Sequence, residues 1–137
     1  MTIAIDRLSN AEIVARTVWG EARGEGAAGW KAVAWVIRNR AAQPGWWGRD
    51  LRGVCLCPQQ FSCWNPEDPN RSKILKLAND DPILSSIRTT VEEVLAGTVP
   101  DPTGGATYYH TRAVAPAWAA RMTATAAIGG HEFYKEV

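Results

Sequence analysis

The stretch SNAEIVARTVWGEAR, residues 9–23, predicts the helix around which the rest of the chain folds. Its first four residues have the S-x-x-E spacing of a capping box, in which side chains of a serine and a glutamate satisfy free backbone N–H groups at the start of a helix. Val14, Val18 and Ala22 then recur on one face. This pattern predicts a helix over residues 10–23 that stops at the glycines that follow.

Two more segments have the pattern of helices. Residues 27–40 are apolar on more than one face, which predicts a central and largely buried helix. Asp81 followed by Pro82 is typical of a helix start, and Gly97 of a helix end, so a helix is expected through Ala96. Charged residues four apart, Glu12 with Arg16 and Arg88 with Glu92, indicate solvated helix faces.

The remaining segments predict a small β element and one long loop. Residues 106–111 and 128–134 have the composition of strands, and residues 116–122 that of a short helix. Residues 44–72 show no sustained period, and so long an irregular segment is typical of a binding or active-site element. We expect an α+β fold, a mostly helical single catalytic domain over residues 1–137.

Composition and charge exclude several classes of protein. A chain of 137 residues with a net charge of +1 lacks the basic surface expected of a nucleic-acid-binding or membrane-surface protein. No apolar run is long enough to span a membrane, and the N-terminus has no secretory pattern, so we expect a protein held in the cytoplasm. We also expect it to be a monomer. Cys55, Cys57 and Cys63 lack zinc-ligand spacing, which predicts buried thiols and no metal or cofactor.

Glu21 is a carboxyl that the surface pattern does not explain. It lies seven residues after Val14 and three after Val18, on the apolar side of the predicted helix and near its C-terminal end. No Lys or Arg stands three or four residues away. A partly desolvated carboxyl in this setting holds its proton more readily and is suited to general acid catalysis near neutral pH. The alternatives are a structural glutamate that caps a loop, and one that forms a long-range ion pair with Arg23, Arg38 or Arg40.

A lone catalytic carboxyl restricts the possible chemistry. Glycoside hydrolysis normally uses two carboxylates. The candidates for a second one have nothing in their surroundings to mark them; they are Glu25, Asp50, Glu67, Asp68 and Asp101. With one carboxyl, the substrate itself must supply the nucleophile. Muramic acid in peptidoglycan has a 6-hydroxyl that closes a 1,6-anhydro ring without water.

Five blocks of sequence resemble the catalytic domain of the spore cortex-lytic enzyme and cell wall hydrolase family. They are TVWGEARGE (residues 17–25), AVAWVIRNR (32–40), PQQFSCWN (58–65), TGGATYYH (103–110) and IGGHEFY (128–134). The resemblance implies a lysozyme-like α+β fold and lytic transglycosylase cleavage between N-acetylmuramic acid and N-acetylglucosamine. It places the family's general acid on Glu21.

The resemblance also implies substrate-binding residues for glycan strands. They are Gln60, Phe61, Ser62, Trp64, Tyr108, Tyr109, His110 and His131. For the two histidines, which lie in the family-like blocks, the alternative is a structural role in hydrogen bonding. Without a secretion signal or wall-binding region, the chain is expected to be a phage or prophage endolysin that waits in the host cytoplasm until it is released to the cell wall. The alternatives are a hydrolytic muramidase or glucosaminidase, a wall peptidase or amidase that uses Cys63, and a non-catalytic sugar-binding module.

The seven tryptophans are divided between core and substrate platform. Trp30, Trp35 and Trp118 stand on predicted helices and are expected in the core, and Trp19 is expected to pack behind Glu21. The other three fall in the long loop, where we expect them over the substrate; they are Trp46, Trp47 and Trp64.

Overall fold

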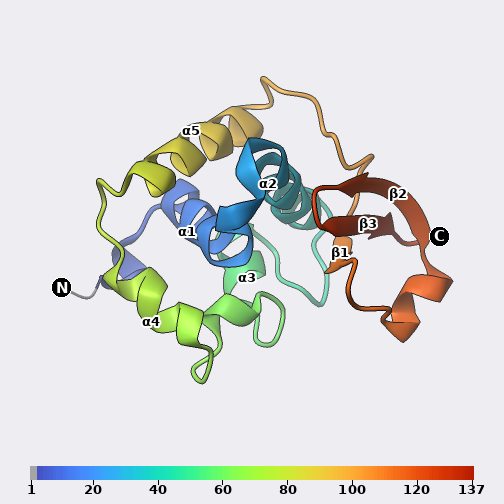
Figure 1. Cartoon of the computed structure of the whole chain (residues 1–137), viewed down its shortest axis with the longest axis horizontal. Coiled ribbons are helices and arrows are strands. Elements are labelled where there is room, and N and C mark those ends of the chain that lie inside the picture. Colours follow the sequence, from blue (N-terminus) through green and yellow to red (C-terminus); the bar gives the residue numbers. More distant parts are fainter. Residues whose placement is uncertain (1–2) are drawn as a thin grey trace.

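The structure, a computed structural model, describes residues 3–137 and consists of a helical part with a small sheet at one side (Figure 1). The helices are α1 (Asn10–Ala22), α2 (Gly26–Ala42), α3 (Leu51–Leu56), α4 (Pro69–Lys76) and α5 (Pro82–Ala96). The strands are β1 (Tyr108–Thr111), β2 (Thr123–Ile128) and β3 (His131–Lys135). The α+β fold predicted from the sequence is confirmed.

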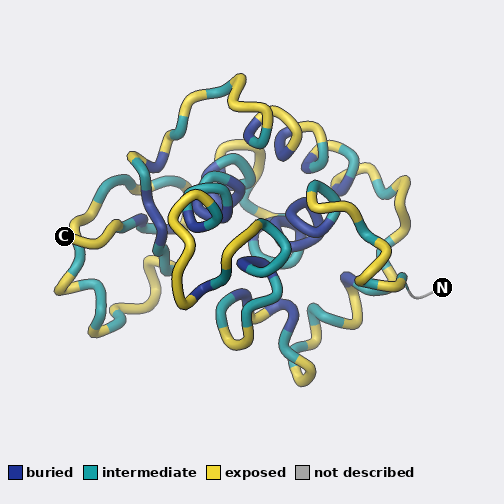
Figure 2. The backbone as a smooth tube through the Cα atoms, turned by 180° about the vertical axis from the view of Figure 1, so that it is seen from behind, coloured by how far each residue is buried: buried dark blue, intermediate teal, exposed yellow. Residues whose placement is uncertain are grey.

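Helix α1 lies at the centre of the helical part and packs against α2, α3 and α5. The hydroxyl of Ser9 accepts a 3.1 Å hydrogen bond from the backbone N–H of Glu12, so the predicted cap forms. Residues on every side of the middle of α1 are buried, and Figure 2 shows buried backbone concentrated in α1 and α2. The helix ends at Ala22 and continues as the 3-10 turn η2 (Arg23–Glu25).

The prediction of one long irregular loop over residues 44–72 is wrong. This segment contains α3, the 3-10 turn η3 (Ser62–Trp64) and the start of α4. The carboxylate of Asp50 accepts a 2.7 Å hydrogen bond from Gly53 N–H at the start of α3, and Asp68 accepts one of 2.8 Å from Asn70 N–H at the start of α4. These helices are too short to show a periodic pattern, and tertiary packing stabilises them.

The sheet is antiparallel with strand order β1-β3-β2. Strand β2 was not predicted, and β3 begins three residues later than expected because Gly129 and Gly130 form the turn that joins β2 to it. The expected helix over residues 116–122 is the 3-10 helix η4 (Ala117–Arg121). One face of the sheet packs on α2 through Phe133, which contacts the cluster of Ala32 and Val36.

Helix α5 has the predicted bounds, with the carboxylate of Asp81 accepting the Leu84 N–H at 3.0 Å. The predicted surface pair of Arg88 with Glu92 is wrong. Arg88 donates to both carboxylate oxygens of Glu12, 76 residues away, at 2.9 and 3.0 Å. Glu12 also bonds the buried Arg16, so this face of α1 is covered by α5 and is not solvated.

Within residues 3–137, we find no helix with both the length and the apolar character that a membrane crossing needs.

Candidate active site

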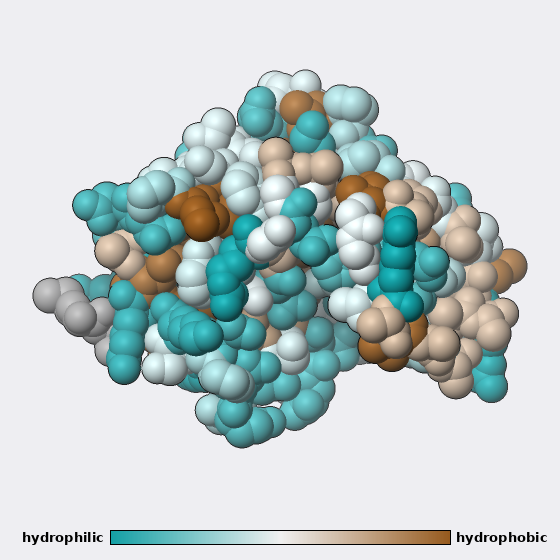
Figure 3. All heavy atoms as spheres, viewed as in Figure 1, coloured by the Kyte–Doolittle hydropathy of each residue, from teal (hydrophilic) through white to brown (hydrophobic). Residues whose placement is uncertain are grey.

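A cavity of about 520 Å³ opens between the helical part and the sheet. Ten residues line it: Glu21, Arg40, Trp46, Gln59, Gln60, Phe61, Tyr108, Tyr109, Trp118 and Met122. We call this the Glu21 cavity. In the view of Figure 1, the space-filling surface is hollowed along its lower edge between the helical part and the sheet (Figure 3). The lining residues come from several elements, among them α1, α2, β1, η4 and the loop before η3.

The carboxyl of Glu21 is held from two sides. It lies in the last turn of α1 and is partly exposed. Oε1 accepts a 3.0 Å hydrogen bond from the hydroxyl of Tyr109, and Oε2 accepts a 3.3 Å bond from the backbone N–H of Cys63. Gly20 makes the second contact possible, since a Cβ there would lie 2.8 Å from the Cβ of Cys63. The two bonds fix the orientation of the carboxyl at the cavity.

Glu21 has no ion pair among the described residues, so the alternative of a structural pair with an arginine is not found. Arg23 donates to Asn70 and to the carbonyl of Trp19. Arg38 donates to the carbonyl of Val94. The carboxyl is therefore available to a substrate.

Tyr109 keeps its phenolic proton. Burial of this side chain, with the nearby charge of Glu21 as a smaller cause, raises the pKa of Tyr109 well above its usual value. The phenol is consequently a hydrogen-bond donor at any pH at which the protein works, and Glu21 is its acceptor.

The other candidate carboxylates are engaged elsewhere. Asp50 and Asp68 cap helices, as described above. Asp101 accepts hydrogen bonds from Asn39, Thr103 and Gly105. Burial alone would raise the pKa of Asp101, but these bonds outweigh it and the pKa is lowered. Glu25 bonds to Gly130, and Glu67 is exposed. Among the described residues that line the Glu21 cavity, Glu21 is the one carboxyl.

Arg40 is the cation of the cavity lining. Its Nε donates to the carbonyl of Thr107 at 2.6 Å, and Nη1 lies 3.5 Å from Oε1 of Gln60. Burial lowers the pKa of Arg40 below its usual range, but a guanidinium stays charged in proteins. The ring of Tyr108 lies 5.4 Å from its guanidinium carbon, which gives one cavity wall both charge and aromatic surface.

Of the substrate-binding residues predicted from the sequence, Gln60, Phe61, Tyr108 and Tyr109 line the cavity together with Glu21. Trp64 does not. It is 8% exposed, and its indole N–H donates to the hydroxyl of Thr17 at 2.9 Å. We correct its prediction, because this bond and the surrounding core leave no face of the ring open.

Three other predicted residues also lie outside the cavity lining. Ser62 is exposed on η3. The ring of His110 stacks on Tyr134 at 5.2 Å, on the face of the sheet opposite Phe133. His131 is 6% exposed and packs edge-on against Tyr109 at 5.1 Å. The alternation of side chains along a strand places His110 on the face of Tyr108 and His131 on the face of Tyr109, so each histidine lies beside a cavity-lining tyrosine without lining the cavity itself.

Besides Trp64, two tryptophan assignments are reversed. Trp118, expected in the core, lines the cavity and packs against Tyr108 at 5.5 Å. Trp47, expected over the substrate, is 6% exposed and donates to the carbonyls of Arg40 and Gln43. Trp46 is 61% exposed and lines the cavity as predicted. The exposure of a side chain in an irregular segment depends on tertiary packing, which cannot be predicted from the local sequence.

The thiols do not favour a cysteine nucleophile. Cys55 and Cys63 are buried. Burial raises the pKa of Cys55 to about 12, and burial with the adjacent Glu21 raises the pKa of Cys63 still further. Both thiols therefore stay neutral, whereas nucleophilic attack needs a thiolate. The part of the chain that the structure describes contains no group of three metal-ligating side chains.

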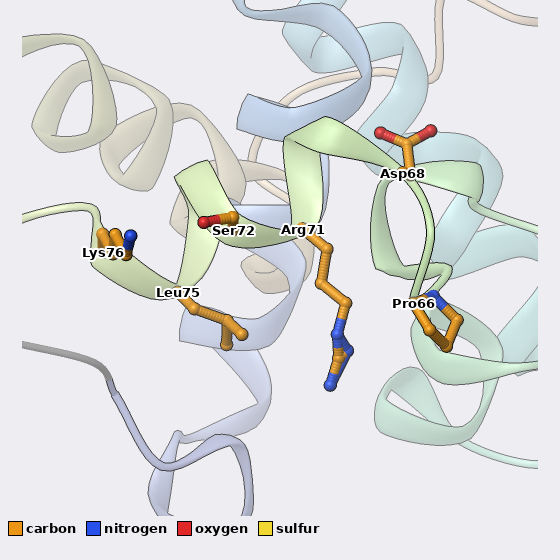
Figure 4. Close-up of a pocket in the computed structure, with 6 residues that line it drawn as sticks. All are labelled: Pro66, Asp68, Arg71, Ser72, Leu75 and Lys76. Carbon is orange, nitrogen blue, oxygen red and sulfur yellow. The ribbon is translucent and has the colours of Figure 1, made fainter.

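A second hollow of about 240 Å³ lies on α4, away from the Glu21 cavity, with which it shares no residue. Figure 4 shows its lining residues, and the side chains of Asp68 and Arg71 point in opposite directions there. They do not converge on a common point, so this hollow is not a candidate for catalysis.

One carboxyl at the edge of an open, aromatic-lined cavity is the arrangement of an enzyme that uses a single acid–base group on its substrate. A model of the cell wall hydrolase family matches residues 24–134, so the chain belongs to that family. It is an enzyme of peptidoglycan degradation. Glu21 lies just before the matched residues, so its assignment rests on the geometry described above.

Two solved structures are similar to this chain. The catalytic domain of the germination-specific lytic transglycosylase SleB from Bacillus anthracis has 28% identity and a TM-score of 0.73, covering 95% of this chain and 98% of that one. The catalytic domain of the Bacillus cereus SleB protein has 28% identity and a TM-score of 0.73, covering 92% and 89%. Among curated proteins, no match was found.

Proposed function

We propose that this chain is a lytic transglycosylase that cleaves peptidoglycan strands between N-acetylmuramic acid and N-acetylglucosamine, with Glu21 as acid and then base. The observation that carries the proposal is the single carboxyl among the described lining residues of the Glu21 cavity. A hydrolase of the usual kind needs a second carboxylate to activate water or to attack the sugar. The similarity to a lytic transglycosylase at 28% identity supports the same chemistry.

In the first step, Glu21 gives its proton to the glycosidic oxygen. The bond from that oxygen to C1 of the muramic acid breaks with oxocarbenium-like character, and the N-acetylglucosamine leaves with a free 4-hydroxyl. The hydrogen bonds from Tyr109 and from Cys63 N–H then hold the carboxylate of Glu21 in place.

In the second step, the 6-hydroxyl of the same muramic acid attacks C1. Its proton passes to Glu21, which acts as the base and returns to its starting form. The C1–O6 bond that forms replaces the bond that broke, so the product ends in a 1,6-anhydro ring. No water is consumed, and no second carboxylate is required.

The walls of the cavity suit a neutral sugar chain. Trp46, Tyr108 and Trp118 form a connected aromatic wall, with ring centroids 6.5 and 5.5 Å apart along it. Aromatic rings with a polar edge bind apolar sugar faces and leave hydroxyls to hydrogen-bonding groups. Gln59, Gln60 and Arg40 supply such groups.

The test is Glu21→Gln, which keeps the size of the side chain and removes the proton. The purified variant and the unchanged protein are incubated with purified peptidoglycan, and the soluble fragments are weighed by mass spectrometry. We expect the unchanged protein to release fragments lighter by one water than hydrolysis products, and the variant to lose about 10²–10⁴-fold in rate while remaining folded. Cleavage by the variant at an unchanged rate would refute the role of Glu21. Fragments with reducing ends would favour the alternative of a muramidase or glucosaminidase.

The endolysin role, the monomeric state and the cytoplasmic location stay predictions. Expression of the chain inside a Gram-negative host tests the first and the last together. We expect no lysis until the inner membrane is permeabilised, and rapid lysis afterwards. Lysis without permeabilisation would contradict cytoplasmic holding.

A further inference from the structure

The carboxylate of Glu25 fastens the turn of the β2–β3 hairpin to the segment that carries Glu21. Glu25 ends η2, four residues after Glu21, and its Oε1 accepts a 2.7 Å hydrogen bond from the backbone N–H of Gly130. The turn allows this close approach because it has no side chains. A Cβ at Gly129, whose φ is +56°, would lie 2.6 Å from the same oxygen. The contact links the segment after α1 to the turn between β2 and β3.

His131 follows this turn and faces the same carboxylate. Its Nδ1 lies 3.5 Å from Oε1 of Glu25, and the residue is 6% exposed. Nδ1 has no hydrogen-bond partner among the described residues. A buried ring nitrogen without a hydrogen-bond partner costs free energy. The nearby Oε1 of Glu25 is the acceptor that could offset this cost.

The ring of His131 in turn holds Tyr109. The two rings meet edge to face, with centroids 5.1 Å apart and an interplanar angle of 88°. On the same face of the sheet, Phe133 packs against Tyr109 at 5.6 Å. The partly buried Tyr109 therefore packs against two rings of β3, with its hydroxyl on Oε1 of Glu21.

We propose that Glu25 and His131 are positioning residues for the reaction, which act through Tyr109 on the carboxyl of Glu21. Neither residue lines the Glu21 cavity. Glu25 fastens the turn that precedes His131 and faces its ring at 3.5 Å, the His131 ring packs against Tyr109, and the Tyr109 hydroxyl bonds Glu21. The inference rests on the proposed function, in which Glu21 is the acid. It gives His131, expected from the family resemblance to bind substrate, a different role.

The first measurement is steady-state kinetics of His131→Ala and Glu25→Gln on glycan strands of defined length. Glu25→Gln keeps an oxygen for the Gly130 N–H but loses the charge that faces His131. We expect kcat to fall at least about fivefold in each variant, because small displacements of catalytic groups are costly, while KM stays within about twofold. Glu93→Gln, on the exposed face of α5, is the matched control and should retain the kcat of the unchanged protein.

The second measurement repeats both substitutions in a Tyr109→Phe background. Tyr109→Phe keeps the ring and removes the hydroxyl that reaches Glu21. If Glu25 and His131 act through that hydroxyl, their substitution should cost less than about twofold in this background. An equal fold-loss in both backgrounds overturns the proposal. So does a variant that unfolds at a lower temperature but has unchanged kcat, since that describes a purely structural role.

The outcomes also separate this inference from the proposed function. Activity retained in Glu21→Gln rejects the proposed function itself. If Glu21→Gln is inactive, but substitution of Glu25 and His131 lowers kcat equally with and without Tyr109→Phe, only the positioning role is rejected. If circular dichroism shows that His131→Ala is unfolded, His131→Gln replaces it in both backgrounds and is judged by the same criteria.

Discussion

The hydroxyl of Tyr109 reaches Oε1 of Glu21 at 3.0 Å, across 88 residues of sequence. This bond joins the first strand of the sheet to the last turn of the central helix. The aromatic wall of the cavity belongs mainly to the sheet side, whereas the carboxyl belongs to the helical part. Neither part contains the site by itself, so the packing of the sheet against the helices creates it.

Tyr109→Phe should therefore lower kcat about 10- to 100-fold. A hydrogen bond to a charged group contributes about 1.5–3 kcal/mol, and about 1.4 kcal/mol corresponds to tenfold in rate. The measurement is the initial rate of release of soluble fragments from purified peptidoglycan. Tyr134→Phe is the control, because it removes a phenolic hydroxyl that bonds Glu132 and His110 and does not belong to the cavity lining. An equal loss in both variants would contradict the role of the bond to Glu21.

The buried guanidinium of Arg16 should be essential for stability. This side chain is 0% exposed and bonds Glu12, Asn79 and the carbonyls of Ile74 and Leu77. Arg16→Met removes the donor from the carbonyls of Ile74 and Leu77 and from the amide oxygen of Asn79, while Glu12 keeps its bonds to Arg88. We expect the free energy of unfolding to fall by about 3–5 kcal/mol, as when one partner of a buried ion pair is removed.

Urea denaturation followed by circular dichroism measures this change. Arg49→Met, at an exposed position in the loop before α3, is the control and should change the free energy of unfolding by less than about 0.5 kcal/mol. A similar small loss in Arg16→Met would mean that the network contributes little to folding.

Glu12 should make the protein sensitive to acid. Hydrogen bonds and charges from Arg88 and Arg16 outweigh the effect of burial and lower the pKa of Glu12 below its usual 4.5. A carboxyl with a lowered pKa in the folded state stabilises it at pH above the unfolded value, and this stability is lost as the pH falls through the folded value. The unchanged protein should thus exceed Glu12→Gln in stability at pH 7, and the difference should shrink below about pH 4.5. Urea denaturation at a series of pH values checks this, and a difference that stays constant with pH would contradict it.

Local signals in the sequence were sufficient to predict the helices that begin with a clear capping residue. The cap at Ser9 and the Asp81-Pro82 start each lie within a few residues of the helix they begin, and both helices form where predicted. Strand β2 has the sequence TATAAI, in which alanine has little preference for strands. It forms because β3 pairs with it, and the sequence of β2 alone does not show that pairing.

Side-chain environments were harder to predict than elements. Glu12 was predicted to be solvated, because its partner Arg88 is 76 residues away and local spacing shows only the neighbouring Arg16. Glu21 was singled out from spacing alone, since an acid on an apolar helix face without a nearby base is unusual. Arg40 gave no such signal, because an arginine next to apolar residues is also common at surfaces.

Trp46 and Trp64 provide the sharpest test of which aromatic side chains face the substrate. Both come from the same segment of sequence, but Trp46 is 61% exposed at the cavity and Trp64 is 8% exposed in the core. Trp46→Ala should raise KM about 2- to 10-fold, because aromatic contacts contribute about 0.5–1.5 kcal/mol, and should leave the free energy of unfolding nearly unchanged.

Trp64→Ala should do the reverse. It removes a large buried ring and leaves the hydroxyl of Thr17 without its indole donor, so the free energy of unfolding should fall by about 3–5 kcal/mol. The fraction that remains folded should bind substrate with an unchanged KM. Kinetics on glycan strands and urea denaturation measure the two quantities independently. A rise in KM in Trp64→Ala alone would mean that the substrate enters on the η3 side, and the aromatic wall of Trp46, Tyr108 and Trp118 would then not be the binding surface.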